Sequence, residues 1–378
     1  MDSSNKLIPI ANFEGQIIRN FQVFQDLQAE WNEMLVNSDA QYVWLSYEWL
    51  TCWWEAFGSE AKLFIPVLRY KKRLVAAAPM MIVKEKIKGV KFRTLRFIAN
   101  GITPRSQFLM NRYDDKNQCS GKEMAEALWL LIVSASNEWD VGSLSNVPEE
   151  NHFFVNFRSA LLNSGLSVVQ IPDRQLSIDI TEGFKIYREK LNRKVKDNLN
   201  YSRNTLRKMG SVSTASVVGT EQVSEALETC FLISTRSWKA DAGVDLGFKP
   251  EYCHFYRSIA MDKVLREKLC IWILEINKQP IAFELMIRSG DRVSYLATDY
   301  DLNFKKCSPG LYLFAQMLEQ LCNLDIKHCD MGGYYDYKLL WTKLFMPHSQ
   351  FWIFNNNIKS RLLHTAKKVS ESRKSDRN

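Results

Sequence analysis

Two segments of this chain that lie 206 residues apart share one pattern without a gap, and this repeat limits the fold more than any other feature. Residues 62–81 and 268–287 are identical at seven of 20 aligned positions. Further along, each half has a helical pattern followed by an apolar stretch that ends in Asp-x-Gly, at 140–142 and 330–332. A recurring order of this kind indicates two copies of one supersecondary unit. The chain is therefore predicted to hold two α/β units.

The second copy is the more informative about the sheet. Its apolar runs at 271–276, 281–287 and 293–298 are separated by polar residues, Pro or Gly, which is typical of antiparallel hairpins. A helical spacing over 311–322 and a further strand at 326–330 follow. We expect an α/β (α+β) fold in which each domain has a mixed, largely antiparallel sheet flanked by helices.

The length of 378 residues also favours two domains. We predict an N-terminal domain over 1–175, mainly structural, and a C-terminal domain over 176–360 that holds the active site. A single amphipathic basic helix over 182–210 enters the second domain, and residues 361–378 form a basic, disordered tail.

The net charge of +8 is concentrated in two segments. Residues 182–210 hold nine Lys and Arg against three acids, and residues 357–378 hold seven against two. The surpluses are six and five, so the rest of the chain is slightly acidic. The body of the chain is therefore not basic, and the tail either solubilises the protein or contacts anionic lipid or nucleic acid.

The sequence shows no targeting signal, no membrane-spanning segment and no metal-binding motif. No apolar run approaches the roughly 18 to 20 residues that cross a bilayer, and the first residues lack the apolar region of a signal peptide. We expect a cytoplasmic protein, with the tail as a contact to the inner membrane face. The eight cysteines form no Cys-x-x-Cys pair and the five histidines no metal spacing, so we expect free thiols and no metal.

A helix start in the second copy predicts an anion site. Pro309 suits the first helical turn and Ser308 the N-cap. The free backbone amides and the positive end of the helix dipole favour a phosphate there. The predicted ligands are Lys305, Lys306, Ser308, Gly310 and Leu311.

The order of these motifs, with Trp44-Leu-Ser-Tyr-Glu-Trp49 and Ala78-Pro79-Met80 in the first half, resembles the tandem GNAT-type acyltransferases grouped with the CelD proteins of cellulose biosynthesis. The wider set resembles the Fem-type aminoacyltransferases. The resemblance implies two GNAT folds and transfer of an acyl group to an amine or hydroxyl. It does not fix the donor, for which we expect acyl-CoA or acetyl-CoA as co-substrate. The turn departs from the usual GNAT phosphate loop, because Pro309 removes one backbone donor.

Acyl transfer needs a base, a group that polarises the donor carbonyl and a proton source. Glu284 lies in an apolar strand, where burial would raise its pKa and make it a base, unless period-two geometry turns it to solvent. Asp301 and Asp330 follow strands, as does Asp299, and their alternatives are capping and turn formation. Tyr337 completes the catalytic candidates as a proton donor.

Substrate contacts are predicted at Arg236, Trp238, Tyr300, Tyr335 and Lys338. Lys338 would hold a phosphate or carboxylate by charge. The alternative for Arg236 and Trp238 is ordinary packing.

We therefore expect an N- or O-acyltransferase that acts on an envelope-related precursor: a nucleotide sugar, a glycan or a lipid base. One alternative is a Fem-like transferase that uses aminoacyl-tRNA, which the shortness of the basic helix disfavours. Another is a non-catalytic protein of polysaccharide assembly. Acceptor, acyl length and oligomeric state do not follow from the sequence.

Overall fold

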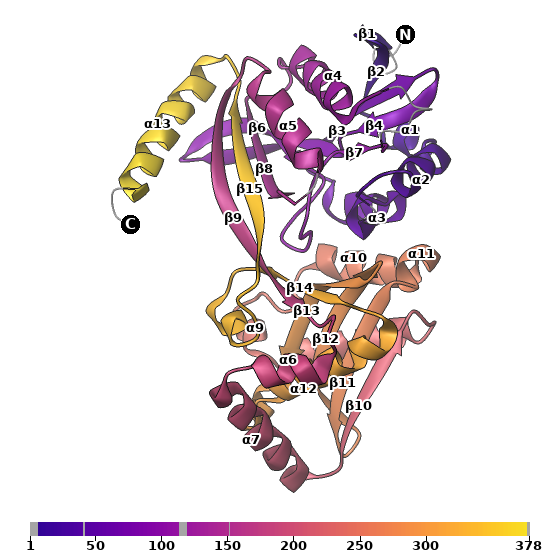
Figure 1. Cartoon of the computed structure of the whole chain (residues 1–378), viewed down its shortest axis with the longest axis vertical. Helices are drawn as coiled ribbons and strands as arrows, with labels where there is room; N and C mark the ends of the chain where they lie inside the picture. The colour runs from indigo at the N-terminus through magenta and orange to yellow at the C-terminus, as the bar shows by residue number, and fades with distance from the viewer. Residues whose placement is uncertain (1–6, 41, 113–118, 151, 376–378) are drawn as a thin grey trace. The chain divides into compact units, whose positions relative to one another are not determined.

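The computed structural model describes residues 7–40, 42–112, 119–150 and 152–375 (Figure 1). The chain divides into two compact units. The first runs up to Arg174 and takes in the chain from Met346 onward, and the second is Gln175–Phe345. Mixed α/β structure is found in both, as the sequence predicts.

The first unit is built on a sheet whose strands follow the order β1-β2-β3-β5-β6-β8-β15-β9, with β4 and β7 beside β3. Its helix α4 packs on β2 and β3. Ser120 starts α4 with a capping box, since Ser120 and Glu123 bond reciprocally to each other's backbone amides. The elements are β1 (Ile8–Ile10), β2 (Phe13–Ile18), α1 (Phe21–Gln25), α2 (Gln28–Val36), η2 (Val43–Leu45), α3 (Tyr47–Phe57), β3 (Ala61–Tyr70), β4 (Arg73–Ala77), β5 (Met80–Ile87), β6 (Val90–Phe97), β7 (Leu109–Met110), α4 (Gly121–Ser134), β8 (Val141–Pro148), α5 (His152–Leu162), β9 (Ser167–Asp179), β15 (Phe345–Phe354) and α13 (Ile358–Ser375).

The second unit has a sheet in the order β9-β14-β13-β12-β11-β10, to which β9 contributes its C-terminal part. Helix α12 packs on β11, β12 and β13, and so does α8. The remaining elements are α6 (Phe184–Lys190), α7 (Arg193–Met209), β10 (Val212–Val218), α8 (Val223–Ser234), α9 (Trp238–Asp241), α10 (Pro250–Met261), α11 (Lys263–Arg266), β11 (Leu269–Ile276), β12 (Gln279–Ser289), β13 (Arg292–Tyr300), η3 (Leu302–Cys307), α12 (Pro309–Leu321), η4 (Cys322–Leu324), β14 (His328–Gly333) and η5 (Asp336–Leu340).

The backbone of the two hairpins repeats as closely as their sequences do. The β3–β4 turn has positive φ at Lys71 and Lys72, and the β11–β12 turn has it at Asn277 and Lys278. Positive φ at both central residues is the geometry of a type I′ hairpin turn. A bulge follows Leu68 in the first hairpin and Leu274 in the second. Each of these pairs of positions is 206 residues apart, so the sequence repeat is a structural repeat.

The first copy breaks its second strand where the other copy continues. Ala78 and Pro79 separate β4 from β5, whereas β12 runs unbroken through the equivalent position, Glu284. The carboxylate therefore belongs to the second copy alone.

Two local predictions are wrong in detail. The basic segment forms two helices, α6 and α7, because Leu191 is extended and the Asn192 side chain caps α7 by accepting from the Lys194 amide. The second unit ends at Phe345 and not at 360, because β15 pairs with β8 of the first unit. The periodicity of apolar residues did not reveal the Asn192 cap that divides the helix. The pairing of β15 with β8 joins residues that are far apart in the sequence, so local sequence could not predict it.

The C-terminal segment is helical over Ile358–Ser375, where composition predicted a disordered tail. The Asn357 side chain accepts a hydrogen bond from the Ser360 amide at 2.9 Å and starts the helix. Leu363 is buried in a cluster with Phe92 and Trp352. One apolar anchor and one cap therefore order a segment whose overall composition is polar.

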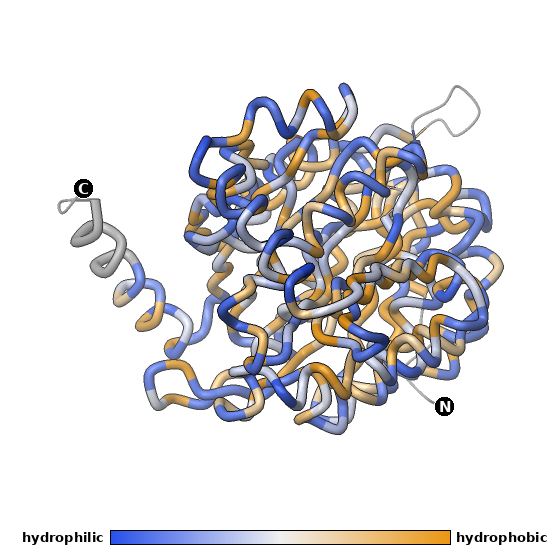
Figure 2. Tube along the Cα trace, turned by 90° about the horizontal axis from the view of Figure 1, so that it is seen from below, coloured by the Kyte–Doolittle hydropathy of each residue, from blue (hydrophilic) through white to orange (hydrophobic). Residues whose placement is uncertain are grey.

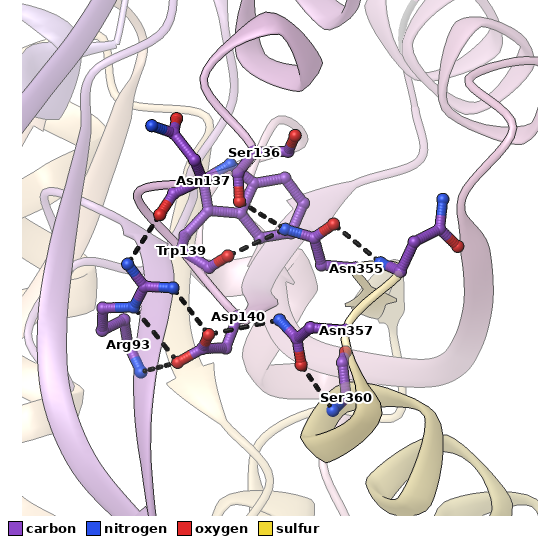
Figure 3. Close-up of polar contacts among 9 residues, drawn as sticks. Arg93, Ser136, Asn137, Trp139, Asp140, Asn355, Asn357 and Ser360 are labelled. Atoms are coloured by element: carbon purple, nitrogen blue, oxygen red, sulfur yellow. Dashed lines mark hydrogen bonds and ion pairs between the residues drawn. The ribbon is translucent and has the colours of Figure 1, made fainter.

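The Asp-x-Gly motif of the first copy has a structural role (Figure 3). Asp140 accepts hydrogen bonds from the Arg93 guanidinium at 2.8 Å and from the Asn357 side chain at 3.2 Å. Neighbouring Asn355 donates to the Ser136 and Trp139 carbonyls at 2.6 and 2.8 Å. Hydrogen bonding and ion pairing with Arg93 outweigh burial and lower the pKa of Asp140. The cluster thus fastens the start of α13 to β6 and β8.

Apolar side chains fill separate cores in the two units. Figure 2 shows the hydrophobic segments gathered inside the fold and the polar segments at its turns. No helix of the described residues combines the length and the apolar character that crossing a bilayer demands.

Candidate functional site

The second unit contains a fork between two parallel strands. β13 and β14 pair only over Arg292–Ser294 and His328–Asp330. Beyond Asp330, β14 shifts its register on β9, and Gly332 adopts φ +70°. The two strands no longer pair beyond that point, while β13 continues to Tyr300 along β12. The fork exposes backbone groups of β14 that no longer pair with β13.

Glu284 occupies the apolar face of β12. Its side chain lies in the same row as Ala282 and Met286, which belong to the core packed on α12, and the residue is only 3 % exposed. Its Oε2 atom has no hydrogen-bond partner among the described residues. Burial raises the pKa of Glu284 to about 8, while Thr298, Lys239 and Lys338 oppose the rise. Glu284 does not face solvent, and with this pKa its buried carboxyl is mostly protonated at neutral pH.

Lys338, on η5, lies in the fork. It is 4 % exposed, and its Nζ donates to the Met331 carbonyl and, at 3.0 Å, to the Gly333 carbonyl. An ammonium has three N–H donors, so one is left over. Burial lowers the pKa of Lys338 to about 8, against the opposing effects of Cys329 and Glu284. Lys338 therefore stays largely protonated at neutral pH and carries a positive charge into a poorly hydrated site.

Three tyrosines surround this ammonium. Nζ lies 4.8 Å from the Tyr335 ring, 5.4 Å from Tyr295 and 5.8 Å from Tyr337. Such contacts stabilise a cation. Desolvation and the nearby Glu284 raise the pKa of Tyr337 to about 12, so its hydroxyl keeps its proton at neutral pH.

Asp299 lies on the opposite face of the sheet from Glu284, since it is the next residue after Thr298, the cross-strand partner of Glu284. It accepts a hydrogen bond from Ser234 at 2.6 Å and pairs with Lys239 at 3.2 Å. Burial raises the pKa of Asp299 despite this lysine. The contacts tie α8 and α9 to β13.

Asp301 is buried and caps η3, where its carboxylate accepts from the Asn303 amide at 2.9 Å. Arg236 lies 3.8 Å from the same carboxylate, and its carbonyl accepts from the Leu302 amide. Trp238 begins α9 and is 53 % exposed. These contacts hold the loop after β13.

Asp330 is buried at the base of the fork and bonds to Arg292 at 2.5 Å. Asp140 and Arg93 make the corresponding pair between β6 and β8. Because both copies keep an Arg–Asp pair at their parallel strands, we assign Asp330 to holding the fork.

The predicted anion site lies at the start of α12. Lys305, Lys306 and Ser308 are exposed, and no ion pair involves either lysine within the described chain. The backbone amides of Gly310 and Leu311 likewise make no hydrogen bond there. Ser308 occupies the N-cap position, as predicted, but its backbone is left-handed and its side chain makes no capping hydrogen bond. Ser202 of α7 instead donates to the Cys307 and Ser308 carbonyls, so α7 holds the turn from behind.

Tyr300 lies near this helix start, since a Cβ on Gly310 would lie 3.7 Å from its ring.

Sequence reasoning missed Lys239, Tyr295 and Thr298. For Thr298 and Tyr295 a signal existed, because both lie on the strand that pairs with β12. For Lys239 the sequence held no such signal, because only the tertiary structure brings α9 close to β13.

The comparisons with known proteins agree with this description. Residues 193–339 match the model of the acetyltransferase (GNAT) domain, a segment that includes Glu284 and Lys338. The sequence has no significant match among curated proteins.

Solved structures share the fold over most of the chain. One is the C-terminal domain (DUF2156) of a protein described as a lysylphosphatidylglycerol synthetase from Agrobacterium fabrum, with 11 % identity, coverage of 91 % of this chain and 96 % of that chain, and a TM-score of 0.53. Another is FemX, with 9 % identity, 89 % and 98 % coverage and a TM-score of 0.56. A third, a conserved protein of unknown function from Bacteroides thetaiotaomicron, has 11 % identity, 87 % and 97 % coverage and a TM-score of 0.52.

The predicted GNAT-type α/β fold is thereby confirmed, as is the likeness to the Fem set at the level of the fold. The narrower resemblance to CelD proteins stays a prediction. Because the sequence identities are only 9 to 11 %, the structural matches support the fold and nothing further.

Proposed function

We propose that the protein is an acyltransferase that moves an acyl group from acyl-CoA to an amine or hydroxyl of an envelope-related precursor, with the chemistry in the second unit. The observation that carries the proposal is a pair of buried groups, the Glu284 carboxyl on β12 and the Lys338 ammonium in the fork, which each have a pKa of about 8 and interact electrostatically. Such pairs are uncommon in purely structural cores and frequent in active sites.

Each group has a defined task in this proposal. Glu284 accepts the proton of the attacking amine or hydroxyl in its ionised form, which is the minor form at neutral pH and which the raised pKa makes a stronger base. The remaining N–H of Lys338 bonds to the oxyanion that forms as the acceptor adds to the acyl carbonyl. Tyr337 supplies a proton to the departing sulfur, and the Tyr337 phenolate recovers it from Glu284. The bond between acceptor and acyl carbon forms as the thioester bond breaks, and no net proton is lost or gained.

The donor's phosphates are assigned to the start of α12. Lys305 and Lys306 bring two charges, and the Gly310 and Leu311 amides bring two free donors. Pro309 brings none, so this site offers fewer amides than a Gly-rich turn. Arg236, Trp238 and Tyr335 remain proposed contacts of the acceptor.

The test measures thiol release from acetyl-CoA and longer acyl-CoA species with a panel of amines, sugars and lipid bases. We expect Lys338→Met and Glu284→Gln to lower kcat by about 10²-fold or more, in the range that loss of an oxyanion donor costs. Lys263→Met, on the exposed helix α11, is the matched control. Activity of Lys338→Met equal to that of the wild type would refute the assignment.

Aminoacyl-tRNA as donor is a second candidate, favoured by the exposed basic side chains of α7. Arg193 pairs with Asp197 at 3.8 Å, but Arg203, Arg207 and Lys208 make no ion pair among the described residues. If this candidate is correct, charged tRNA binds with an affinity that falls steeply with salt, and acyl-CoA gives no turnover. Absence of turnover with both donors would favour a non-catalytic protein.

A further inference from the structure

A cavity of about 680 Å³ opens in the second unit away from the residues assigned to catalysis. It lies between the segment around α6 and the start of α7 on one side and residues 339–344 on the other. Its volume is within the usual range of small-molecule sites, about 300 to 1,000 Å³. None of the residues assigned to the acyl-transfer reaction lines it.

Apolar side chains form one part of the cavity wall. Ile180, Leu191, Val195 and Trp341 form buried parts of it, whereas Leu340 and Leu344 stay more than two-fifths exposed. Trp341 is fixed from behind by the Phe314 ring of α12, at 4.7 Å between ring centres. The one phenol in the wall, Tyr187, already donates to the Trp341 carbonyl at 2.7 Å. An alkyl chain that lies on this part of the wall would cover the exposed leucines.

The charges at the cavity are uneven. Lys190 pairs with Glu182, and Asp179 accepts the Thr181 amide at 2.9 Å. Lys194 and Lys343 are exposed and make no ion pair within the described residues. Together the five charged residues of the lining carry three positive and two negative charges. The two unpaired lysines therefore provide charge complementarity for one anionic group.

We infer that this cavity binds a single-chain amphiphile, with the alkyl chain against Leu191, Leu340 and Leu344 and an anionic head at Lys194 and Lys343. Phosphate and carboxylate heads share this chemistry. The site is independent of the acyl-transfer reaction, but it touches the element that carries Lys338: the Trp341 and Thr342 amides donate to the Lys338 carbonyl at 3.0 and 3.3 Å.

The experiment is calorimetric titration of the full chain at low salt with decyl phosphate, decanoate, decanol and hexyl phosphate, all below micelle formation. Each buried methylene contributes about fourfold in affinity, so we expect decyl phosphate to bind on the order of 10²-fold tighter than hexyl phosphate. The two anionic decyl probes tell which head group is preferred, and either result is consistent with the site.

Paired variants locate the ligand. Leu340→Gln with Leu344→Gln should weaken decyl phosphate at least tenfold, while Leu232→Gln, an exposed leucine of α8, should not. Lys194→Ala with Lys343→Ala should weaken the anionic probes about tenfold and leave decanol unchanged, with Lys185→Ala on α6 as the control.

Several outcomes would overturn the inference. They are no saturable binding, no effect of the leucine pair, equal loss with the control variants, or displacement of decyl phosphate by excess CoA. The last result would place the ligand in the reaction site. Because binding is read without turnover, the inference stands or fails separately from the proposed acyltransferase activity.

Discussion

The buried carboxyl of Glu284 should leave a measurable mark on stability, and Glu284→Gln is the perturbation that reveals it. The pKa of this residue is about 8 in the folded protein and 4.5 when solvated. A difference of about 3.5 in pKa corresponds to about 5 kcal/mol at most. Glutamine keeps the shape of the side chain and removes the ionisation.

The direction in which stability changes with pH follows from which state of the chain, folded or unfolded, binds the proton of Glu284. Between pH 4.5 and 8 the unfolded chain has released the proton of Glu284 and the folded chain has kept it, so rising pH favours unfolding. The stability of the wild type relative to Glu284→Gln should be greatest below pH 4.5. It should fall by about 1.4 kcal/mol per pH unit through the window and level off above pH 8.

Lys338 changes stability in a different window. Its pKa is lowered from 10.5 to about 8, so the penalty for burying its charge is fully present below pH 8 and is relieved as pH rises from 8 to 10.5. The slope between pH 5 and 8 therefore belongs to Glu284, although the two groups interact.

The assay is urea unfolding followed by hydrogen exchange of peptides from β12 and β13, because a chain of two units need not unfold in one step. Glu267→Gln, which changes an exposed carboxylate next to β11, is the control and should give a pH-independent difference. If the wild type and Glu284→Gln keep a constant difference in stability from pH 5 to 8, the argument for a buried proton acceptor is wrong.

Three further predictions concern the fork and the helix start. Arg292→Ala should destabilise the second unit by about 3 kcal/mol, because it removes the guanidinium that pairs with the buried Asp330 carboxylate; urea unfolding measures this, and a loss below 1 kcal/mol would contradict the assigned role. Gly332→Ala should cost about 1 kcal/mol through its φ of +70° alone, since a Cβ there meets nothing within 4 Å, and Gly333→Ala, equally free of contacts but without positive φ, should be near neutral. Lys305→Ala with Lys306→Ala should raise KM for acyl-CoA about tenfold at low salt and leave kcat unchanged, and an effect that does not shrink in high salt would count against phosphate binding.

The sequence by itself determined the repeated unit, the strands of the second hairpin and the start of α12. These features depend on neighbours along the chain: two-residue turns, period-two apolar runs and a Pro at a helix start. That is why residues 71–72 and 277–278 keep one turn geometry across 206 residues. The sequence also placed Glu284 in an apolar strand, but local pattern left open which face of the sheet it occupies.

Tertiary structure alone decided the rest. It buried Glu284 on the α12 side, brought Lys338 to the Met331 and Gly333 carbonyls, and tied Asp330 to Arg292. It also returned β15 to the first unit and ordered the basic C-terminal segment around Leu363. Each of these depends on partners that are distant in sequence, and the energy of a buried charge is set by such partners rather than by its own neighbours along the chain.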